Sequence, residues 1–375
     1  MAGIYIHIPF CRQACTYCNF HFSVSSENKN AVIAAIVKEI DLTASGHSNE
    51  YIETIYFGGG TPSLLDENDL RLIFDAIREK FPVTADAEIT LEANPDDINK
   101  STLTAWRNTG INRLSVGLQS FNEAELIWMN RAHNAAQSLQ CLDDIIESGF
   151  TDFSADLIYG SPLQTDEDLR KNFEILAGKK VPHISCYALT VEPGTVLNKL
   201  IRDQKSPAPD AGRQSEQFHL LLAMTEAAGY EQYEISNFCK PGHRSRHNSS
   251  YWQGKPYFGF GPSAHSFDGK KKRKWNISNN SLYVQSIEKN IIPAEEEILT
   301  EEQKLNELIM ISLRTSEGLK LDVVQQNFGE EKKAKLEKDA VPFLENGRMI
   351  KSGTALILTK EGKFFADGIA SEMFV

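Results

Sequence analysis

The regular alternation of strand-like and helix-like segments over the first two-thirds of the chain constrains the fold most. Strand-like runs occupy residues 3–10, 51–60, 87–95, 113–121, 153–162 and 183–194, and helical periodicity occupies residues 30–45, 66–81, 100–110 and 213–229. Such alternation predicts parallel strands joined by right-handed crossovers. At least six strands therefore predict an α/β fold with a barrel or partial barrel, and an open doubly wound sheet is the alternative.

Unusual residues follow these strands. The segments at the strand ends are "PFC", "GGGTP", "EANP", "LQSF", "YGSP" and "VEPGT". Parallel strands end at one edge of the sheet, and ligands bind at that edge in both candidate folds. We therefore expect this edge to be the active face.

Three of the six cysteines lie in the loop directly after the first strand. Cys11, Cys15 and Cys18 have the spacing C-x3-C-x2-C. Three thiolates on a short loop suit three irons of a cubic iron–sulfur cluster, and the fourth iron is then open to a small molecule. A structural zinc site is the competing interpretation, with His7 or His21 as the fourth ligand.

Charge and hydropathy exclude several classes of protein. The net charge of -12 argues against general nucleic-acid binding, which needs a broad positive surface. No apolar run approaches the ~20 residues of a membrane span, and the N-terminal segment "MAGIYIHIPF" lacks the pattern of a secretory signal. We expect a cytoplasmic protein with no nucleic-acid partner, in which close-spaced cysteines are metal ligands or redox groups rather than disulfides. The basic run at 269–275 allows at most peripheral contact with a membrane.

Composition changes twice along the chain. Residues 1–230 form the predicted barrel core, and residues 231–298 are an extension rich in aromatic, glycine and basic residues. The pattern predicts helices over 301–345 and a hairpin followed by a helix over 348–369, so we expect a small winged-helix-like domain over 299–375. Because "EEKKAKLEKD" mixes both charges, we expect this domain to pack or to dock a partner rather than to bind DNA.

The cysteine spacing, with Tyr17 just before the last cysteine, resembles the radical S-adenosylmethionine (SAM) family, and so does "FGGGTP". The segments "IYIHIPFCRQACTYCNF", "GGGTPSLL", "NRLSVGLQSF" and "DLIYGSP" are similar to the oxygen-independent coproporphyrinogen III dehydrogenases and their relatives, over nearly the whole chain. The resemblance implies a partial (β/α)6 barrel with a small C-terminal α+β winged-helix-like domain. It also implies that the three cysteines hold a [4Fe-4S] cluster whose fourth iron binds the methionine part of SAM.

The resemblance further implies a set of SAM contacts. They are Tyr5, Gly59, Gly60, Thr61, Glu92, Gln119, Arg131, Asp156 and Ala188, with Tyr17 beside the adenine. The chemistry of these residues agrees, because glycines let the backbone approach a ligand closely and charged side chains suit the charged groups of an amino acid. For any one charged residue, a structural salt bridge is the alternative.

The sequence differs from the dehydrogenases in two features, and in both it resembles the haem chaperones of the same family. Phe20 stands where the dehydrogenases have a further cysteine, and only ten residues precede Cys11. The segment "RHNSSYW" contains H-N-x-x-Y-W, which is similar to the haem-binding motif of the chaperones. His247 would then bind haem iron, with His265 and His243 as second choices. A place near SAM is the alternative for His265, and packing of one loop against the barrel is the structural alternative for the motif.

The resemblance therefore implies a cytoplasmic protein that binds haem and delivers it to haem-accepting proteins. Radical decarboxylation of coproporphyrinogen III, or another radical reaction on a tetrapyrrole, is the alternative. Because the set of expected SAM contacts is intact, the enzymatic alternatives stay open.

Overall fold

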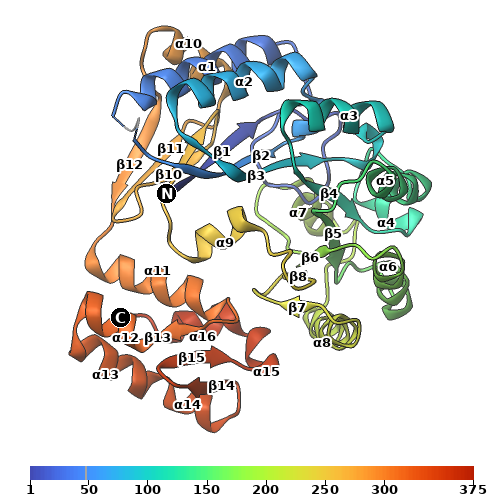
Figure 1. Cartoon of the computed structure of the whole chain (residues 1–375). Coiled ribbons are helices and arrows are strands. Elements are labelled where there is room, and N and C mark those ends of the chain that lie inside the picture. The colour runs from blue at the N-terminus through green and yellow to red at the C-terminus, as the bar shows by residue number, and fades with distance from the viewer. Residues whose placement is uncertain (47–48) are drawn as a thin grey trace.

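The computed structural model describes residues 1–46 and 49–375. A curved sheet covered by helices forms the larger part, and a smaller C-terminal unit packs below it (Figure 1). The central strands are β1 (Ala2–Ile8), β2 (Ile52–Gly59), β3 (Val83–Ala93), β4 (Arg113–Gln119), β5 (Phe153–Tyr159) and β6 (His183–Ala188). Each successive pair in this series is parallel, as the alternating pattern predicts.

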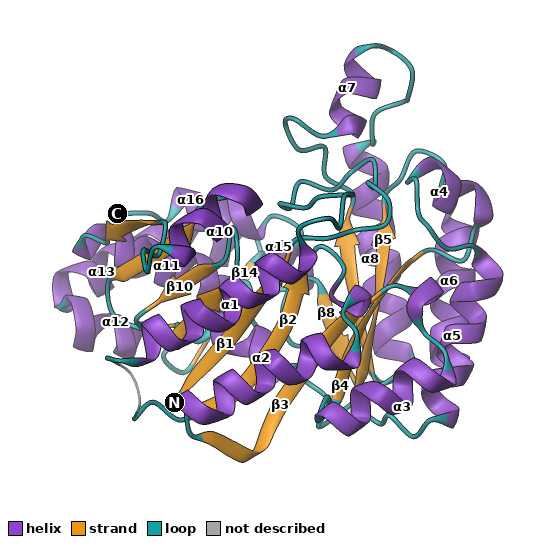
Figure 2. Cartoon of the chain, turned by 90° about the horizontal axis from the view of Figure 1, so that it is seen from above, coloured by secondary structure: helices purple, strands orange, loops and turns teal. Residues whose placement is uncertain are grey.

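Helices cover the outer face of this sheet (Figure 2). They are α1 (Lys29–Ala44), α2 (Glu67–Lys80), α3 (Lys100–Thr109), α5 (Ala135–Glu147), α6 (Asp166–Gly178) and α8 (Ala211–Ala227). The loops that follow the strands contain α4 (Glu123–Trp128), α7 (Val196–Arg202) and two short 3-10 turns, η1 (Pro62–Leu64) and η2 (Pro95–Asp97). Local sequence explains the helix ends: Asp66 accepts a bond from the Asp69 N–H group at the start of α2, and Gly110 ends α3 at a φ of 106°.

The two faces of the central strands differ in polarity. Outward residues such as Ile6, Phe57 and Leu91 are fully buried in the hydrophobic core beneath the helices. The inward positions alternate with them and include Tyr5, Thr54, Tyr56, Thr90, Glu92, Ser115, Ser154, Asp156 and Ser185. Because strand side chains alternate between faces, the interior of the partial barrel is polar, which suits a ligand-binding cavity.

The segment after α8 continues the same sheet. It contains β7 (Glu231–Gln232), β8 (Asn237–Cys239), α9 (Arg246–Trp252), β9 (Tyr257–Phe260), β10 (His265–Phe267), β11 (Lys272–Asn276), α10 (Asn280–Glu288) and β12 (Ala294–Ile298). The twelve strands have the order β12-β11-β10-β9-β1-β2-β3-β4-β5-β6-β8-β7. Within the described residues the sheet ends at β12 and β7 without closing, so it is a partial barrel.

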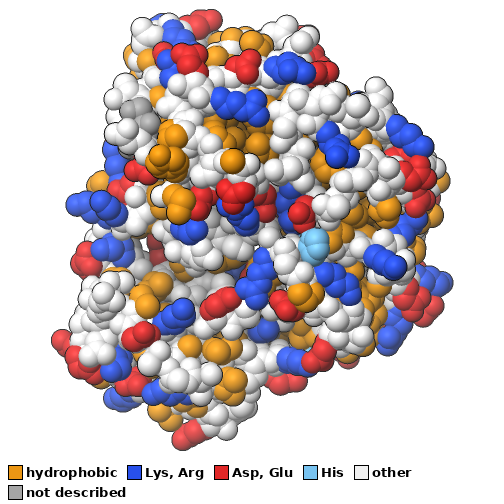
Figure 3. All heavy atoms as spheres, viewed as in Figure 1, with side chains coloured by type: hydrophobic (Ala, Val, Ile, Leu, Met, Phe, Trp, Pro, Cys, Tyr) orange, Lys and Arg blue, Asp and Glu red, His pale blue; other side chains and the backbone are white. Residues whose placement is uncertain are grey.

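The basic run at 269–275 lies on the β10–β11 hairpin and pairs within the chain. β11 lies antiparallel to the acidic strand β12, where Lys272 contacts Glu296 at 2.7 Å. Arg273 contacts Glu307 at 2.7 Å. On the face shown in Figure 3, acidic and basic side chains are interspersed. Two of the five basic side chains of this run therefore have carboxylate partners within the chain.

The C-terminal unit has its own hydrophobic core. Its elements are α11 (Glu301–Leu313), β13 (Leu319–Lys320), α12 (Leu321–Phe328), α13 (Glu330–Asp339), α14 (Val341–Glu345), β14 (Met349–Ser352), β15 (Ala355–Leu358), α15 (Lys360–Lys363) and α16 (Ala366–Glu372). Its three strands form a small antiparallel sheet of order β13-β15-β14. This arrangement of helices and a small sheet agrees with the predicted winged-helix-like domain.

Two sequence predictions of element length are wrong. The strand expected over 183–194 ends at Ala188, because the next residues turn and Thr195 caps α7 by accepting from the Asn198 N–H group. The helical stretch expected over 301–345 is interrupted by β13, which pairs with β15. Among the helices described, none is both long enough and apolar enough to cross a membrane.

Candidate functional site

The three cysteines lie on a loop, residues 9–23, that we call the cluster loop. Its two ends pair with each other, because the Cys11 N–H group donates to the Ser23 carbonyl at 3.0 Å and the Ser23 N–H group donates to Pro9 at 2.9 Å. Its middle is fixed at Thr16, which donates to the Met129 carbonyl at 3.0 Å and accepts from the Leu197 N–H group at 2.7 Å. These bonds hold the thiols at the C-terminal ends of the strands, which we call the rim.

The thiols are unpaired and partly exposed, and polar groups contact two of them. The Thr61 hydroxyl donates to the Cys11 sulfur at 3.4 Å, and Arg131 Nη1 donates to the Cys15 sulfur at 3.3 Å. Burial raises the pKa of the Cys11 thiol to about 11, Thr61 and Arg131 lower it, and the charges of Cys18 and Cys15 raise it. The three thiols are therefore within electrostatic reach of one another and of one cation.

A site for a single metal ion at the three cysteines has less support than a site for a cubic cluster. Within the described part of the chain, no group of three or more His, Cys, Asp or Glu side chains is arranged to hold one metal ion. His7, a candidate fourth zinc ligand, has hydrogen-bond partners at both ring nitrogens, the Tyr5 hydroxyl at 3.2 Å and the His21 carbonyl at 2.9 Å. The ring of His21, the other candidate, pairs with Asn280 at 2.8 Å. A cubic cluster differs from a zinc site because each thiolate binds its own iron.

The glycine triplet brings β2 directly against the cluster loop. A Cβ atom on Gly60 would lie 2.7 Å from the Phe10 carbonyl oxygen and 2.8 Å from that of Ile8. A Cβ atom on Gly59, which has a φ of +108°, would lie 2.6 Å from the His7 ring. Only glycine permits this approach, which leaves backbone N–H groups and the Thr61 hydroxyl beside the thiols.

Two buried carboxyl groups lie inside the barrel below the rim. Glu92 accepts the Tyr56 hydroxyl at 2.8 Å and the Gly59 N–H group at 3.2 Å. Burial and the charge of Asp156 raise the pKa of Glu92 to about 7, although these hydrogen bonds lower it. Asp156 accepts from the Ser115 hydroxyl at 3.3 Å, and burial raises the pKa of Asp156 to about 6. The two groups have the chemistry to accept hydrogen bonds from ribose hydroxyls or an ammonium group.

Arg131 joins the cluster loop to the barrel. Its Nη2 donates to the Gly117 carbonyl at 2.7 Å and to Asn94 at 2.8 Å, and its Nη1 donates to the Tyr17 hydroxyl at 3.4 Å as well as to Cys15. Tyr17 packs against an apolar group formed by Met129, Ile158, Leu189 and Leu197. A flat apolar base such as adenine would suit this surface.

The predicted SAM contacts are brought together at or just below the rim. Gln119 ends β4 with a φ of 67°, Ala188 ends β6, and Tyr5 stacks on Tyr56 with ring centroids 6.1 Å apart. Two buried atoms here, Asp156 Oδ1 and Arg131 Nε, have no hydrogen-bond partner within the described residues. Buried polar atoms are normally paired, so the polar, glycine-lined interior fits a charged ligand beside the thiols.

The sequence interpretation missed two residues of this site. Tyr56 and Asn94 were not among the expected contacts, yet they hold Glu92 and Arg131 respectively. Tyr56 occupies the inward face of β2 two residues before Gly58, so the period of the strand would have indicated it.

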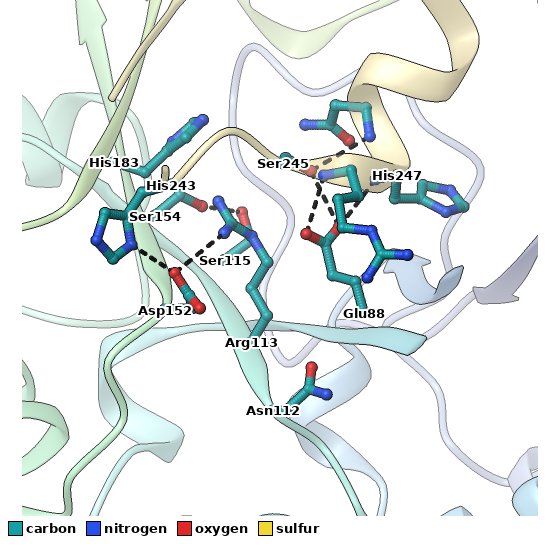
Figure 4. Close-up of polar contacts among 12 residues, drawn as sticks. Glu88, Asn112, Arg113, Ser115, Asp152, Ser154, His183, His243, Ser245 and His247 are labelled. Carbon is teal, nitrogen blue, oxygen red and sulfur yellow. Dashed lines mark hydrogen bonds and ion pairs between the residues drawn. The ribbon is translucent and has the colours of Figure 1, made fainter. Parts of the chain in front are cut away.

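The histidines proposed for haem iron lie in different places. His247 is 1% exposed on α9, at the N-terminal ends of β1 and β2, which we call the barrel floor. Its two ring nitrogens pair with Thr54 and Tyr251, both at 2.8 Å, and this arrangement does not fit the expected haem ligand. His243 pairs with Asp152 at 2.6 Å (Figure 4). His265 begins β10 beside the rim, is exposed, and stacks on Trp275.

Comparison with known proteins defines the class first. The family model of the radical SAM superfamily matches residues 5–176, and the model of the HemN C-terminal domain matches residues 299–365. The fold, the cluster loop and these matches together define a radical SAM protein. "Heme chaperone HemW" of Mycobacterium tuberculosis is 32% identical over 372 residues, which cover 98% of this chain and 93% of that protein.

Further relatives agree. "Heme chaperone HemW" of Bacillus subtilis is 32% identical over 98% of each chain, and that of Escherichia coli is 36% identical over 70% of this chain and 69% of its own length. The chain belongs to the HemW family of radical SAM proteins. The solved structure of coproporphyrinogen III oxidase (HemN) from Escherichia coli has a TM-score of 0.85 at 24% identity, covering 100% of this chain and 90% of that chain. That likeness shows the fold alone, whereas the family implies a [4Fe-4S] cluster and SAM.

Proposed function

We propose that this chain is a haem chaperone, which binds haem and delivers it to haem-accepting proteins. One observation carries the proposal: two relatives named heme chaperone HemW are 32% identical over 98% of this chain. Phe20 supports it, since this side chain is 65% exposed where the resemblance places a further cysteine in the dehydrogenases.

The rim residues have the chemistry to hold the cofactors of the family. Cys11, Cys15 and Cys18 would bind the cluster, and Arg131 would balance their negative charge. Glu92 and Asp156 would accept hydrogen bonds from SAM. When bound, the cluster would supply one-electron chemistry, and its iron without a cysteine ligand would be the one that takes SAM.

We propose His265 as the residue that contacts haem iron, because its imidazole is exposed at the rim. Its ring lies 6.2 Å from that of Trp275, with an interplanar angle of 26°. An aromatic pair of this kind offers a flat apolar surface to a porphyrin and a ring nitrogen to its iron. The haem is cargo in this proposal, and His265 lies on the same edge of the sheet as the cluster loop.

Haem titration of the anaerobically reconstituted full chain tests the proposal. We expect saturable binding of one haem per chain, and a shifted Soret band or weaker binding in His265→Ala. A second reaction contains coproporphyrinogen III, SAM and a reductant, and we expect no decarboxylated porphyrinogen. Catalytic formation of that product, or haem binding that does not saturate, would contradict the proposal.

A further inference from the structure

The buried position of His247 gives the H-N-x-x-Y-W motif a role other than haem ligation. The helix that carries His247, α9, is fixed against the barrel by a carboxylate of β3 (Figure 4). Glu88 accepts the backbone N–H groups of Arg246 at 2.9 Å and of His247 at 2.8 Å. A carboxylate at the first turn of a helix is favourable because free N–H groups point toward it. The first turn of α9 therefore has a fixed position on the barrel floor.

Both ring nitrogens of His247 form hydrogen bonds with neighbouring residues. Burial lowers its pKa to about 3, so the ring is neutral at pH 7, with one donor and one acceptor nitrogen. Nδ1 pairs with the Thr54 hydroxyl and Nε2 pairs with the Tyr251 hydroxyl, both at 2.8 Å. Binding to haem iron would require one of these bonds to break and α9 to leave the floor.

A direct contact connects His247, on the barrel floor, with the predicted SAM site nearer the rim. The Tyr56 ring stacks on the imidazole, with centroids 4.9 Å apart and an interplanar angle of 23°. The hydroxyl of the same tyrosine donates to Glu92 at 2.8 Å. Thr54 and Tyr56 are both inward residues of β2, so His247 contacts this strand at two successive inward positions. Loss of the imidazole would leave Tyr56 unsupported on one face, and cores respond to such a void by shifting side chains.

Packing also accounts for the aromatic residues of the motif. Tyr251 contacts both His247 and Tyr257 edge to face. Trp252 lies under the guanidinium of Arg314, 5.4 Å from the ring centroid, at the end of α11. In Figure 1, α9 lies between the barrel and α11. The motif therefore links the barrel floor to the C-terminal domain.

We infer that His247 is a positioning residue, which holds Tyr56 so that its hydroxyl orients the Glu92 carboxylate toward SAM. The H-N-x-x-Y-W motif then acts on the cosubstrate site from below and leaves haem to the rim. The inference deepens the proposed function and rests on it only where haem is measured.

The test uses the full chain with its cluster reconstituted, in the variants His247→Ala, His247→Gln, Tyr56→Phe and the double variant His247→Ala with Tyr56→Phe. Equilibrium dialysis with labelled SAM gives the dissociation constant, and haem titration gives the Soret maximum. We expect His247→Ala and Tyr56→Phe each to weaken SAM binding about tenfold, the effect of one lost hydrogen bond. The Soret maximum should stay at its wild-type position in all variants.

A residue that acts through Tyr56 has a further signature. The double variant should bind SAM no more weakly than His247→Ala alone, since coupled residues are not additive. His247→Gln, which keeps a donor and an acceptor, should recover part of the affinity. Additive losses, unchanged SAM affinity in His247→Ala, or a shifted Soret band in that variant would overturn the inference. If the wild-type chain binds no haem, the proposed function fails, while the SAM measurements still decide the role of His247.

Discussion

Substitution of Gly60 by alanine tests the close contact between β2 and the cluster loop. The new Cβ atom would lie 2.7 Å from the Phe10 carbonyl oxygen, 2.8 Å from that of Ile8 and 2.9 Å from the Phe10 nitrogen. All three atoms belong to the backbone, so no side chain can rotate away. Overpacking of this kind costs about 1–3 kcal/mol. The bond from the Gly60 N–H group to Ile8, 2.9 Å long, adds about 1 kcal/mol if it breaks.

We therefore expect Gly60→Ala to lower the free energy of unfolding by roughly 2–4 kcal/mol, as the sum of these two costs. Because the strand and the loop must separate, iron and sulfide per chain should also fall after anaerobic reconstitution. Urea unfolding and iron analysis measure the two effects. Gly178→Ala is the matched control, since its Cβ atom would meet nothing within 4 Å at the end of α6. Wild-type stability and iron content in Gly60→Ala would refute the reasoning.

Three further predictions follow from the same structure. Cys15→Ala should lose most of its reconstituted iron, whereas Cys141→Ala, in a buried site far along the chain, should keep it; equal iron contents would contradict the assignment. Arg131→Lys should lower both iron content and thermal stability, because an ammonium cannot replace the fork that reaches Cys15, Gly117 and Asn94; a silent substitution would remove Arg131 from the site. Because folding lowers the pKa of His247, the imidazole takes up a proton more readily in the unfolded chain than in the folded chain below pH 6.5. The contribution of the neutral imidazole to stability is therefore present above that pH and is lost as pH falls toward 3. Between pH 7 and pH 5, His247→Gln should therefore lose about 2 kcal/mol less stability than the wild type, and parallel pH profiles in urea unfolding would contradict this.

Local signals were sufficient to predict the series of parallel strands and the edge of the sheet at which the cysteine loop lies. Helix α2 is an example, because its observed bounds, Glu67–Lys80, lie within one residue of the predicted range 66–81 at each end. The cysteine loop could be placed at the rim because it follows a strand and because parallel strands end together. For the same reason Glu92 and Asp156 were expected close to each other, and the charge of Asp156 does reach Glu92.

The features that the sequence did not predict depend on tertiary contacts. The strands between residues 231 and 298 are two to five residues long, too short for a period to emerge, and β7 has only two residues. The motif around His247 shows residue types suited to haem but not the end of the barrel where they lie. That position depends on the bond between His247 and Glu88, which are 159 residues apart in the sequence. A contact of that range leaves no local pattern.

The most direct test of the chaperone proposal is the rate at which haem moves from the loaded chain to an apo-haemoprotein of the same host. Stopped-flow absorbance follows the Soret change as the acceptor concentration is raised. Direct delivery predicts a transfer rate that increases with acceptor concentration and exceeds the rate at which haem leaves the chain alone. A rate that is independent of the acceptor, equal to spontaneous release, would contradict the account.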